Sequence, residues 1–274
     1  MKIAFWSNVH GQPRTTSNMV AVSIAATLEY GQSCLVTQTH FNLNNLEAYF
    51  IGNRENSQDI FMDIGIDGLA RSMILAPIGK ETIENYSIPL LHNKLVLLPG
   101  TTSANKEVFH KEMAGTICRI LKEAEKYFDL VFIDINSGED EVSKLVLEQA
   151  DVIVVNLCQN RCMLDNYFSK GLIKDKKSMF LIGNYDRNSV YNLHNLKKLY
   201  RPLSKGIISA IPYNTGFMDA QSDGSVMKYM RKKLVLEKNG VNNYFIESIK
   251  DAVEKLMKIT GNKKGGRSLW QKIS

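Results

Sequence analysis

Short, almost continuous apolar runs alternate with helix-patterned segments along most of this chain, and this alternation restricts its fold more than any other feature. Such runs are typical of parallel strands buried on both faces, because helices cover both sides of the sheet they form. The pattern predicts an α/β fold: a doubly wound, mostly parallel sheet with helices on both faces and ligands at the carboxyl ends of its strands. The runs are Ile3–Trp6, Ser33–Thr37, Leu95–Leu98, Leu130–Ile135, Val152–Leu157, Met179–Ile182 and Gly206–Ile211.

The segments between and after these runs have helical patterns. They are Met19–Tyr30, Lys111–Tyr127, Glu141–Gln149, Asn192–Tyr200 and Tyr244–Lys258. A chain of 274 residues with 44% hydrophobic content can bury one sizeable core. We therefore expect a single domain over 1–260, followed by a basic, partly apolar tail over 261–274. The least regular segment is Gly52–Asn93, and we expect it to form short helices outside the sheet.

The cysteines and the apolar segments bear on the compartment. Cys34, Cys118, Cys158 and Cys162 lack the spacing of metal ligands or of a redox motif, which favours buried, reduced thiols. The apolar run at the N-terminus is too short for a signal peptide. No segment approaches the roughly 20 apolar residues of a membrane span. We expect a cytoplasmic protein.

The first apolar run leads into the loop Ser7–Arg14, then the pair Thr15-Thr16, then a helical pattern. Strand, loop, hydroxyl residue and helix in this order are the layout of a phosphate-binding P-loop. Backbone N–H groups of the loop and of the helix N-terminus would bind an anion, and a threonine hydroxyl would reach Mg²⁺. The alternative is an ordinary surface loop between a strand and a helix.

Later strand ends carry polar residues that suit the same interpretation. Asp134 ends an apolar run and is followed by a turn at Gly138, as in a site where a carboxylate meets Mg²⁺ through water and a glycine senses the γ-phosphate. An acid that merely caps a strand end is the alternative. Asn184 ends another run, where its amide could read an adenine edge, and Pro212 follows the last run.

Together these segments resemble the ParA/MinD family of deviant-Walker P-loop ATPases, which belong to the SIMIBI class. Within that family the chain is most similar to the divergent CpaE/TadZ branch, which is associated with assembly and localisation of Flp-type pili. The resemblance implies a site for ATP or ADP with Mg²⁺, in which Thr15 and Asp134 would hold the metal. The residues it places at the nucleotide are Gly11, Gln12, Arg14, Thr15, Thr16, Asp134, Gly138, Asn184 and Pro212.

The loop departs from the family pattern K-G-G-x-G-K-T-T. Val9 stands at the lysine that reaches across a dimer, and Arg14 at the phosphate lysine. His10 and Pro13 replace glycines, and proline has no backbone N–H to donate. An arginine keeps the charge but not the compact ammonium group.

The second departure concerns hydrolysis. The two acids of the family's first switch are replaced by Thr37 and Thr39, and a threonine cannot act as a carboxylate base. His10 or His40 could orient water instead, and Asp134 is the catalytic candidate. Phosphoryl transfer depends on positioning and charge stabilisation, so these losses should bring hydrolysis close to background. We expect a pseudo-ATPase; a loop kept only as architecture is the alternative.

The resemblance implies a homodimer that positions or scaffolds a membrane-associated assembly, such as a Flp-type pilus or a secretion system, through protein partners. The formal charge of +6 lies mostly in the tail, which has Lys263, Lys264, Arg267 and Lys272 and no acid. With Leu269 and Trp270, it could bind an anionic membrane peripherally; a disordered solubilising tail is the alternative.

An active ParA/MinD-type ATPase in DNA partitioning or division-site regulation is the other functional hypothesis. DNA binding would need a basic face on the folded body, although such residues usually form a solvated helix face. The residues that could supply one are Arg187, Lys197, Lys198, Arg201, Lys228, Arg231, Lys232 and Lys233.

Overall fold

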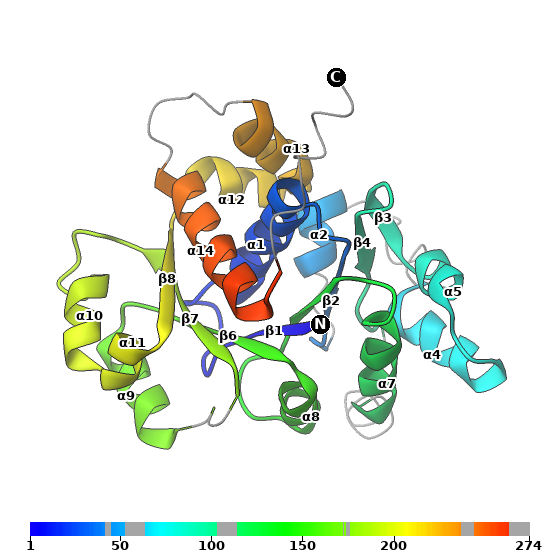
Figure 1. The fold of residues 1–274 in the computed structure, drawn as a ribbon, viewed down its shortest axis with the longest axis horizontal. Coiled ribbons are helices and arrows are strands. Elements are labelled where there is room, and N and C mark those ends of the chain that lie inside the picture. The colour runs from blue at the N-terminus through cyan, green and yellow to red at the C-terminus, as the bar shows by residue number, and fades with distance from the viewer. Residues whose placement is uncertain are drawn as a thin grey trace.

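The computed structural model describes residues 1–41, 45–52, 64–102, 114–171, 173, 176–236 and 244–262. These residues contain one eight-stranded sheet with the order β3-β4-β2-β5-β1-β6-β7-β8 (Figure 1). Neighbouring strands are parallel, except that β3 runs antiparallel to β4 at one edge. The strands are β1 (Lys2–Trp6), β2 (Cys34–Gln38), β3 (Ile88–Leu91), β4 (Leu95–Leu98), β5 (Leu130–Asp134), β6 (Val152–Leu157), β7 (Ser178–Tyr185) and β8 (Ile207–Pro212).

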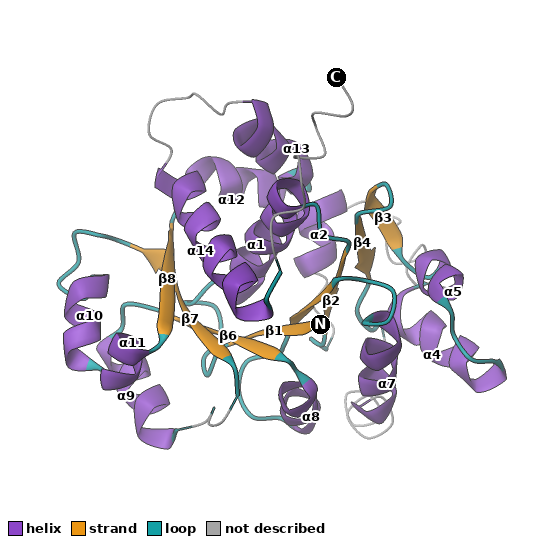
Figure 2. Ribbon diagram, viewed as in Figure 1, coloured by secondary structure: helices purple, strands orange, loops and turns teal. Residues whose placement is uncertain are grey.

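Helices cover both faces of this sheet (Figure 2). The first face carries α1 (Thr15–Tyr30), α2 (Asn45–Ile51), α12 (Thr215–Ser222), α13 (Val226–Arg231) with the π-helix η2 (Lys232–Leu236), and α14 (Tyr244–Thr260). The second face carries α4 (Gly65–Leu75), α5 (Lys80–Asn85), α7 (Ala114–Ala124), α8 (Glu141–Gln149), α9 (Arg161–Lys170), α10 (Leu193–Leu199) and α11 (Arg201–Lys205).

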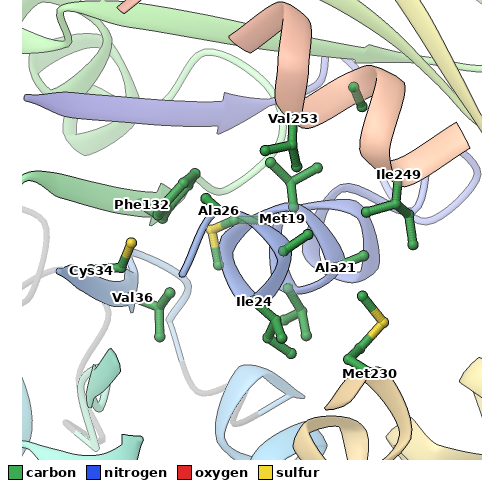
Figure 3. Close-up of a cluster of buried hydrophobic side chains, with 14 of the residues drawn as sticks. Met19, Ala21, Ile24, Ala26, Cys34, Val36, Phe132, Met230, Ile249 and Val253 are labelled. Atoms are coloured by element: carbon green, nitrogen blue, oxygen red, sulfur yellow. The ribbon is translucent and has the colours of Figure 1, made fainter. Parts of the chain in front are cut away.

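The core has two halves because successive side chains of a strand point to opposite faces. In β1, Ile3 and Phe5 belong to the half under α1, and Ala4 and Trp6 to the other half. Helix α1 is buried on almost every side, between the sheet, α13 and α14. Figure 3 shows side chains of α1 packed among residues of β2, β5, α13 and α14. This burial holds the N-terminus of α1 in a fixed place beside the end of β1.

The predicted α/β architecture is confirmed, and every predicted strand is present with ends that differ by three residues at most. The segment Gly52–Asn93 forms the short helices α4 and α5 as expected, and it also supplies the edge strand β3, which was not predicted from the sequence. Pro89 interrupts the strand pattern of β3, and an edge strand tolerates proline because its outer side needs no N–H donor.

Two sequence expectations fall partly or wholly outside the described residues. The predicted helix Lys111–Tyr127 is observed as α7, and its first residues, 111–113, are not described. The basic tail is described only as far as residue 262. Across the described chain, no helix combines the length and the apolar character needed to cross a membrane.

Candidate functional site

The carboxyl ends of the parallel strands meet at one edge of the sheet, and the predicted site residues lie there. The loop after β1 leads into α1, Asp134 ends β5, Asn184 lies near the end of β7, and Pro212 ends β8. A cavity of about 280 Å³ is lined by the loop, the start of α1, and residues after β2 and β5. A second cavity, of about 580 Å³, lies between the ends of β7 and β8 and the start of α14. Arg14 lines both.

Backbone N–H groups of the loop after β1 are hydrogen-bonded within the loop itself. The N–H of Gln12 donates to the carbonyl of His10 at 2.9 Å, and the N–H of Arg14 donates to the carbonyl of Gly11 at 3.1 Å. Pro13 has no N–H. Three consecutive loop residues therefore offer no backbone donor to a ligand. The side-chain amide of Asn18 fixes this turn, since its Nδ2 donates to the Pro13 carbonyl and to Asn156 Oδ1, both at 2.9 Å.

The N-terminus of α1 keeps its anion-binding character. The first N–H groups of an α-helix have no partner inside the helix. The first turn of α1 contains no acidic residue, and the N-cap residue Arg14 makes no side-chain cap. The positive end of the helix dipole therefore faces the 280 Å³ cavity, as a phosphate group requires.

Asp134 is fully buried at the end of β5, and two side chains contact one of its oxygens. The hydroxyl of Thr16 donates to Asp134 Oδ2 at 2.5 Å, and His40 Nε2 lies 3.2 Å from the same oxygen. Asp134 Oδ1 is buried without a hydrogen-bond partner. A buried carboxylate oxygen without a partner is costly, and it suits a site that binds a cation or water.

A metal at this place would need ligands beyond the protein. The described residues contain no group of three His, Cys, Asp or Glu side chains arranged to hold a metal ion. Mg²⁺ commonly binds through one or two carboxylates together with phosphate oxygens and water. The unpartnered oxygen of Asp134 and the hydroxyl of Thr16 fit that mode, with His40 as a competing cation.

The structure places Thr16, rather than Thr15, against Asp134. Arg14 has φ 57° and ψ 41°, a left-handed conformation that favours glycine, and α1 begins at Thr15. In the motif G-x-x-x-x-G-K-[S/T], glycine precedes the lysine, and the hydroxyl residue follows it. With Thr16 in the hydroxyl position, Thr15 takes the lysine position and Arg14 the glycine position. The geometry thus favours an alignment one residue away from the one that the letters suggest.

The side chain of Arg14 turns toward α12. Its Nη1 lies 3.7 Å from the sulfur of Met218, while the residue still lines the cavities on both sides. In the alignment set by Thr16, no lysine follows the loop. Arg14 is therefore the cation available from this loop, and its guanidinium lies between the two cavities.

The acids near His40 set the direction of its pKa shift. Burial alone would lower the pKa of His40, but the charge of Asp134, its hydrogen bond, and the charges of Glu47 and Asp140 outweigh it, so the pKa is raised. Glu47 is 2% exposed on α2 and accepts hydrogen bonds from Gln38 Nε2 at 2.6 Å and from the Gly100 N–H at 2.7 Å. Burial raises the pKa of Glu47.

Sequence reasoning missed Glu47 and did not foresee the contact between His40 and Asp134. Glu47 is the single charged residue in the mostly apolar short helix α2, which was the available signal for a buried, partnered carboxylate. His10 and His40, the two histidines that could orient water, both line the 280 Å³ cavity.

The second cavity has a polar and aromatic lining. Asn184 adopts a left-handed conformation with φ 50°, where the pairing of β7 and β8 shifts register. Across the cavity, the guanidinium carbon of Arg187 lies 5.5 Å from the ring centroid of Tyr244. Pro212 completes the lining at the end of β8. A planar heterocycle would find an amide, an arginine and an aromatic ring here.

Three predicted residues, Gln12, Gly138 and the fully buried Asp134, lie beside the cavities rather than in their linings. Gln12 turns away, with its Oε1 3.7 Å from the sulfur of Cys158. Gly138, at φ 97°, donates its N–H to the Ser7 carbonyl at 3.1 Å and accepts from Trp6 Nε1 at 2.8 Å. These bonds tie the turn after β5 to the end of β1.

Comparison with solved structures gives long, close superpositions. A ParA family ATPase from Chlorobium tepidum TLS matches over 93% of this chain and 98% of its own, at 16% identity and a TM-score of 0.71. The septum site-determining protein MinD complexed with Mg-ADP, from Pyrococcus horikoshii OT3, matches over 97% of this chain and 100% of its own, at 14% identity and a TM-score of 0.70. This chain has the fold of the ParA and MinD ATPases.

A third match broadens the comparison within the same fold. A putative plasmid partition protein from Borrelia burgdorferi B31, bound to AMPPNP, covers 94% of this chain and 98% of its own, at 15% identity and a TM-score of 0.63. No family model matches the sequence, and no characterised relative is found by sequence comparison. At these identities the likeness establishes the fold, and the activity has to be argued from the site.

Proposed function

We propose that this chain is a ParA/MinD-like nucleotide-binding protein whose hydrolysis is very weak or absent, and that it positions or scaffolds a membrane-associated assembly. The nucleotide part is supported by the open N-terminus of α1, by the paired cavities that share Arg14, and by two matched structures that hold Mg-ADP and AMPPNP. The pilus or secretion part rests on the resemblance of the sequence to the CpaE/TadZ branch.

The contact of His40 with Asp134 carries the proposal. At a hydrolytic site of this fold we expect an acid to hold the attacking water and a metal to stand beside the β5 aspartate. Here the nearest ionisable neighbour of Asp134 is a histidine at 3.2 Å, and the residues at the acid positions are Thr37 and Thr39, both buried. An imidazole beside the carboxylate competes with the metal and removes negative charge from the site.

The residues have distinct roles in this proposal. The first turn of α1, with Thr15 and Thr16, would bind phosphate, and Arg14 would bridge phosphate and base. Thr16 and Asp134 would hold Mg²⁺, which would supply charge neutralisation for the phosphates. Asn184 and Pro212 would flank the base. The chain's own contribution is to bind and orient the nucleotide. Of the described side chains that line the cavity, His10 and His40 are the ones that could orient water.

The partner proposals go with this function. We propose a homodimer, because a nucleotide-dependent switch of this fold reports its state through association, and we propose peripheral membrane contact through the tail. Neither is needed for nucleotide binding. Each can therefore fail without overturning the site.

The test is calorimetric titration of the intact chain with ATP and ADP, with and without Mg²⁺, followed by a phosphate-release assay. We expect binding in the micromolar range, on the order of −8 kcal/mol, and phosphate release close to the buffer background. Arg14→Ala should weaken binding by about tenfold or more, as a charge-assisted contact is worth about 1.5–3 kcal/mol. The matched control is Arg201→Ala, which removes an exposed arginine from α11.

Three results would contradict the proposal in different ways. Absence of binding up to millimolar nucleotide would leave the loop as architecture. Sustained phosphate release in the presence of DNA or membrane would support the active ParA/MinD-type ATPase instead. Equal binding by Arg14→Ala and Arg201→Ala would remove Arg14 from the site.

A further inference from the structure

The end of α4 exposes a run of apolar residues far from the nucleotide site. Ile74 is 83% exposed and Leu75 is 87% exposed, and Ala76 and Pro77 continue the exposed run. Helix α4 buries Ile66 and Leu69 at its other end, so the exposure is confined to its last turn. Four consecutive exposed apolar residues are unusual for a soluble surface and mark a place where something binds.

The facing wall is basic. Helix α7 turns Ile117 and Leu121 into the core, its outer side carries Arg119 and Lys122, and Lys126 follows in the turn after the helix. Lys126 is paired with Glu123 at 2.6 Å. Within the described residues, neither Arg119 nor Lys122 has an acidic partner. Two uncompensated positive charges therefore stand beside the exposed apolar run.

These two walls enclose a hollow of about 690 Å³, lined by Met73–Ile78 on one side and by α7 on the other. We call it the α4–α7 groove. Figure 1 shows α4 and α7 side by side at the β4 end of the sheet, away from α14. The groove belongs to neither cavity of the nucleotide site, and the resemblance assigns it no role.

We propose that the α4–α7 groove binds an acidic amphipathic helix of a protein partner. The apolar face of that helix would cover Ile74 and Leu75, and its acidic residues would pair with Arg119 and Lys122. Charge selects this occupant: the tail of this chain is basic over 263–274 and would be repelled. Shape argues against a membrane, because a flat bilayer surface cannot enter a hollow that an inserted helix can fill.

The test uses fluorescein-labelled model helices and the full chain. One peptide of about 18 residues has leucines at i, i+3, i+4 and i+7 on an alanine background, with glutamates flanking the leucines. In the second peptide, lysine replaces every glutamate. Anisotropy titrations are made with the native chain, with Ile74→Ser/Leu75→Ser and with Arg119→Glu/Lys122→Glu. The matched controls are Leu199→Ser, at 55% exposure, and Lys197→Glu/Lys198→Glu, both on α10.

We expect saturable binding of the acidic peptide that weakens by about tenfold or more in each groove variant and stays unchanged in the α10 controls. The charge-reversed variant should gain the lysine peptide, a result that unfolding cannot produce. Equal loss in the α10 controls, or no saturable binding, would overturn the proposal. The proposal would also be overturned if the native chain bound vesicles of phosphatidylglycerol through Ile74 and Leu75 but did not bind the acidic peptide. Self-association that Ile74→Ser/Leu75→Ser abolishes would assign the groove to a second copy and overturn it equally.

Discussion

A Cβ atom added to Gly183 would lie 1.9 Å from the carbonyl oxygen of Pro13. The same atom would lie 2.7 Å from Nδ2 of Asn18, the group that fixes the loop after β1. Strand β7 therefore meets this loop backbone to backbone, and the meeting is possible only because residue 183 has no side chain. The buried Pro13 at the end of this loop is therefore held between α1 and β7.

Replacing Gly183 by alanine should displace the loop and break the bond from Asn18 to the Pro13 carbonyl. We expect a loss of about 1–3 kcal/mol in the free energy of unfolding, as for other overpacked sites, and weaker nucleotide binding. Urea unfolding and calorimetry measure the two effects. The control is Gly115→Ala in α7, where an added Cβ meets nothing within 4 Å; it should stabilise by about 0.5–1 kcal/mol. Similar curves for both variants would show that the loop moves freely.

Thr15 and Thr16 make a matched pair for the alignment of the loop. Thr16→Val removes the only hydroxyl that donates to Asp134 within the described residues, and we expect a cost of about 1–3 kcal/mol in unfolding free energy with loss of any Mg²⁺ dependence of binding. For the Thr15 hydroxyl the described residues offer no hydrogen bond, so Thr15→Val should change stability by about 0.5 kcal/mol or less. If Thr15→Val is the variant that loses Mg²⁺ dependence, the alignment suggested by the letters is the right one.

The strands could be predicted because their signal is local. A buried parallel strand is almost entirely apolar, so β4 is visible as an unbroken run and β6 as a run interrupted only by Asn156, and both were predicted with the observed ends. The strand β3 was missed because Pro89 breaks its pattern and only the pairing with β4 makes it a strand. The first turn of α1 was missed because Thr15, Thr16 and Ser17 have little helix propensity, and tertiary contacts to Asp134 and Gln221 hold them.

The sequence placed the candidate site residues at strand ends, but it did not predict the contacts between them. Asp134, Arg14 and Asn184 each follow or end a strand, and parallel topology alone brings such positions to one edge. The contact of His40 with Asp134 depends on how the chain turns after β2, and the left-handed backbone of Arg14 depends on the closure of the loop by Asn18. Neither leaves a mark in the spacing of residues, which is why the alignment suggested by the letters differs by one position from the one that the geometry favours.

Deleting residues 263–274 tests the membrane proposal. The deleted segment has four basic residues and no acid, and each basic residue near an anionic leaflet contributes about 1 kcal/mol. We expect the intact chain to sediment with vesicles rich in phosphatidylglycerol at low salt, and the truncated chain to stay in the supernatant. Vesicles of phosphatidylcholine alone are the lipid control. Retention of the truncated chain would place the membrane contact elsewhere.

The pairing of His40 with buried acids predicts how stability depends on pH. The raised pKa of His40 means that the folded chain holds its proton more tightly than the unfolded chain does. This contribution is complete below the pKa of an unfolded histidine, about 6.5, and is lost as the pH rises through the raised value in the folded chain. The raised pKa of Glu47 acts with the same sign. His40→Gln, followed by urea unfolding across the neutral range, should therefore flatten the fall in stability with rising pH. His194→Gln on α10 controls for the loss of a histidine elsewhere. A wild-type curve that rises with pH over this range and is unchanged in His40→Gln would mean that His40 does not share a proton-linked contact with Asp134.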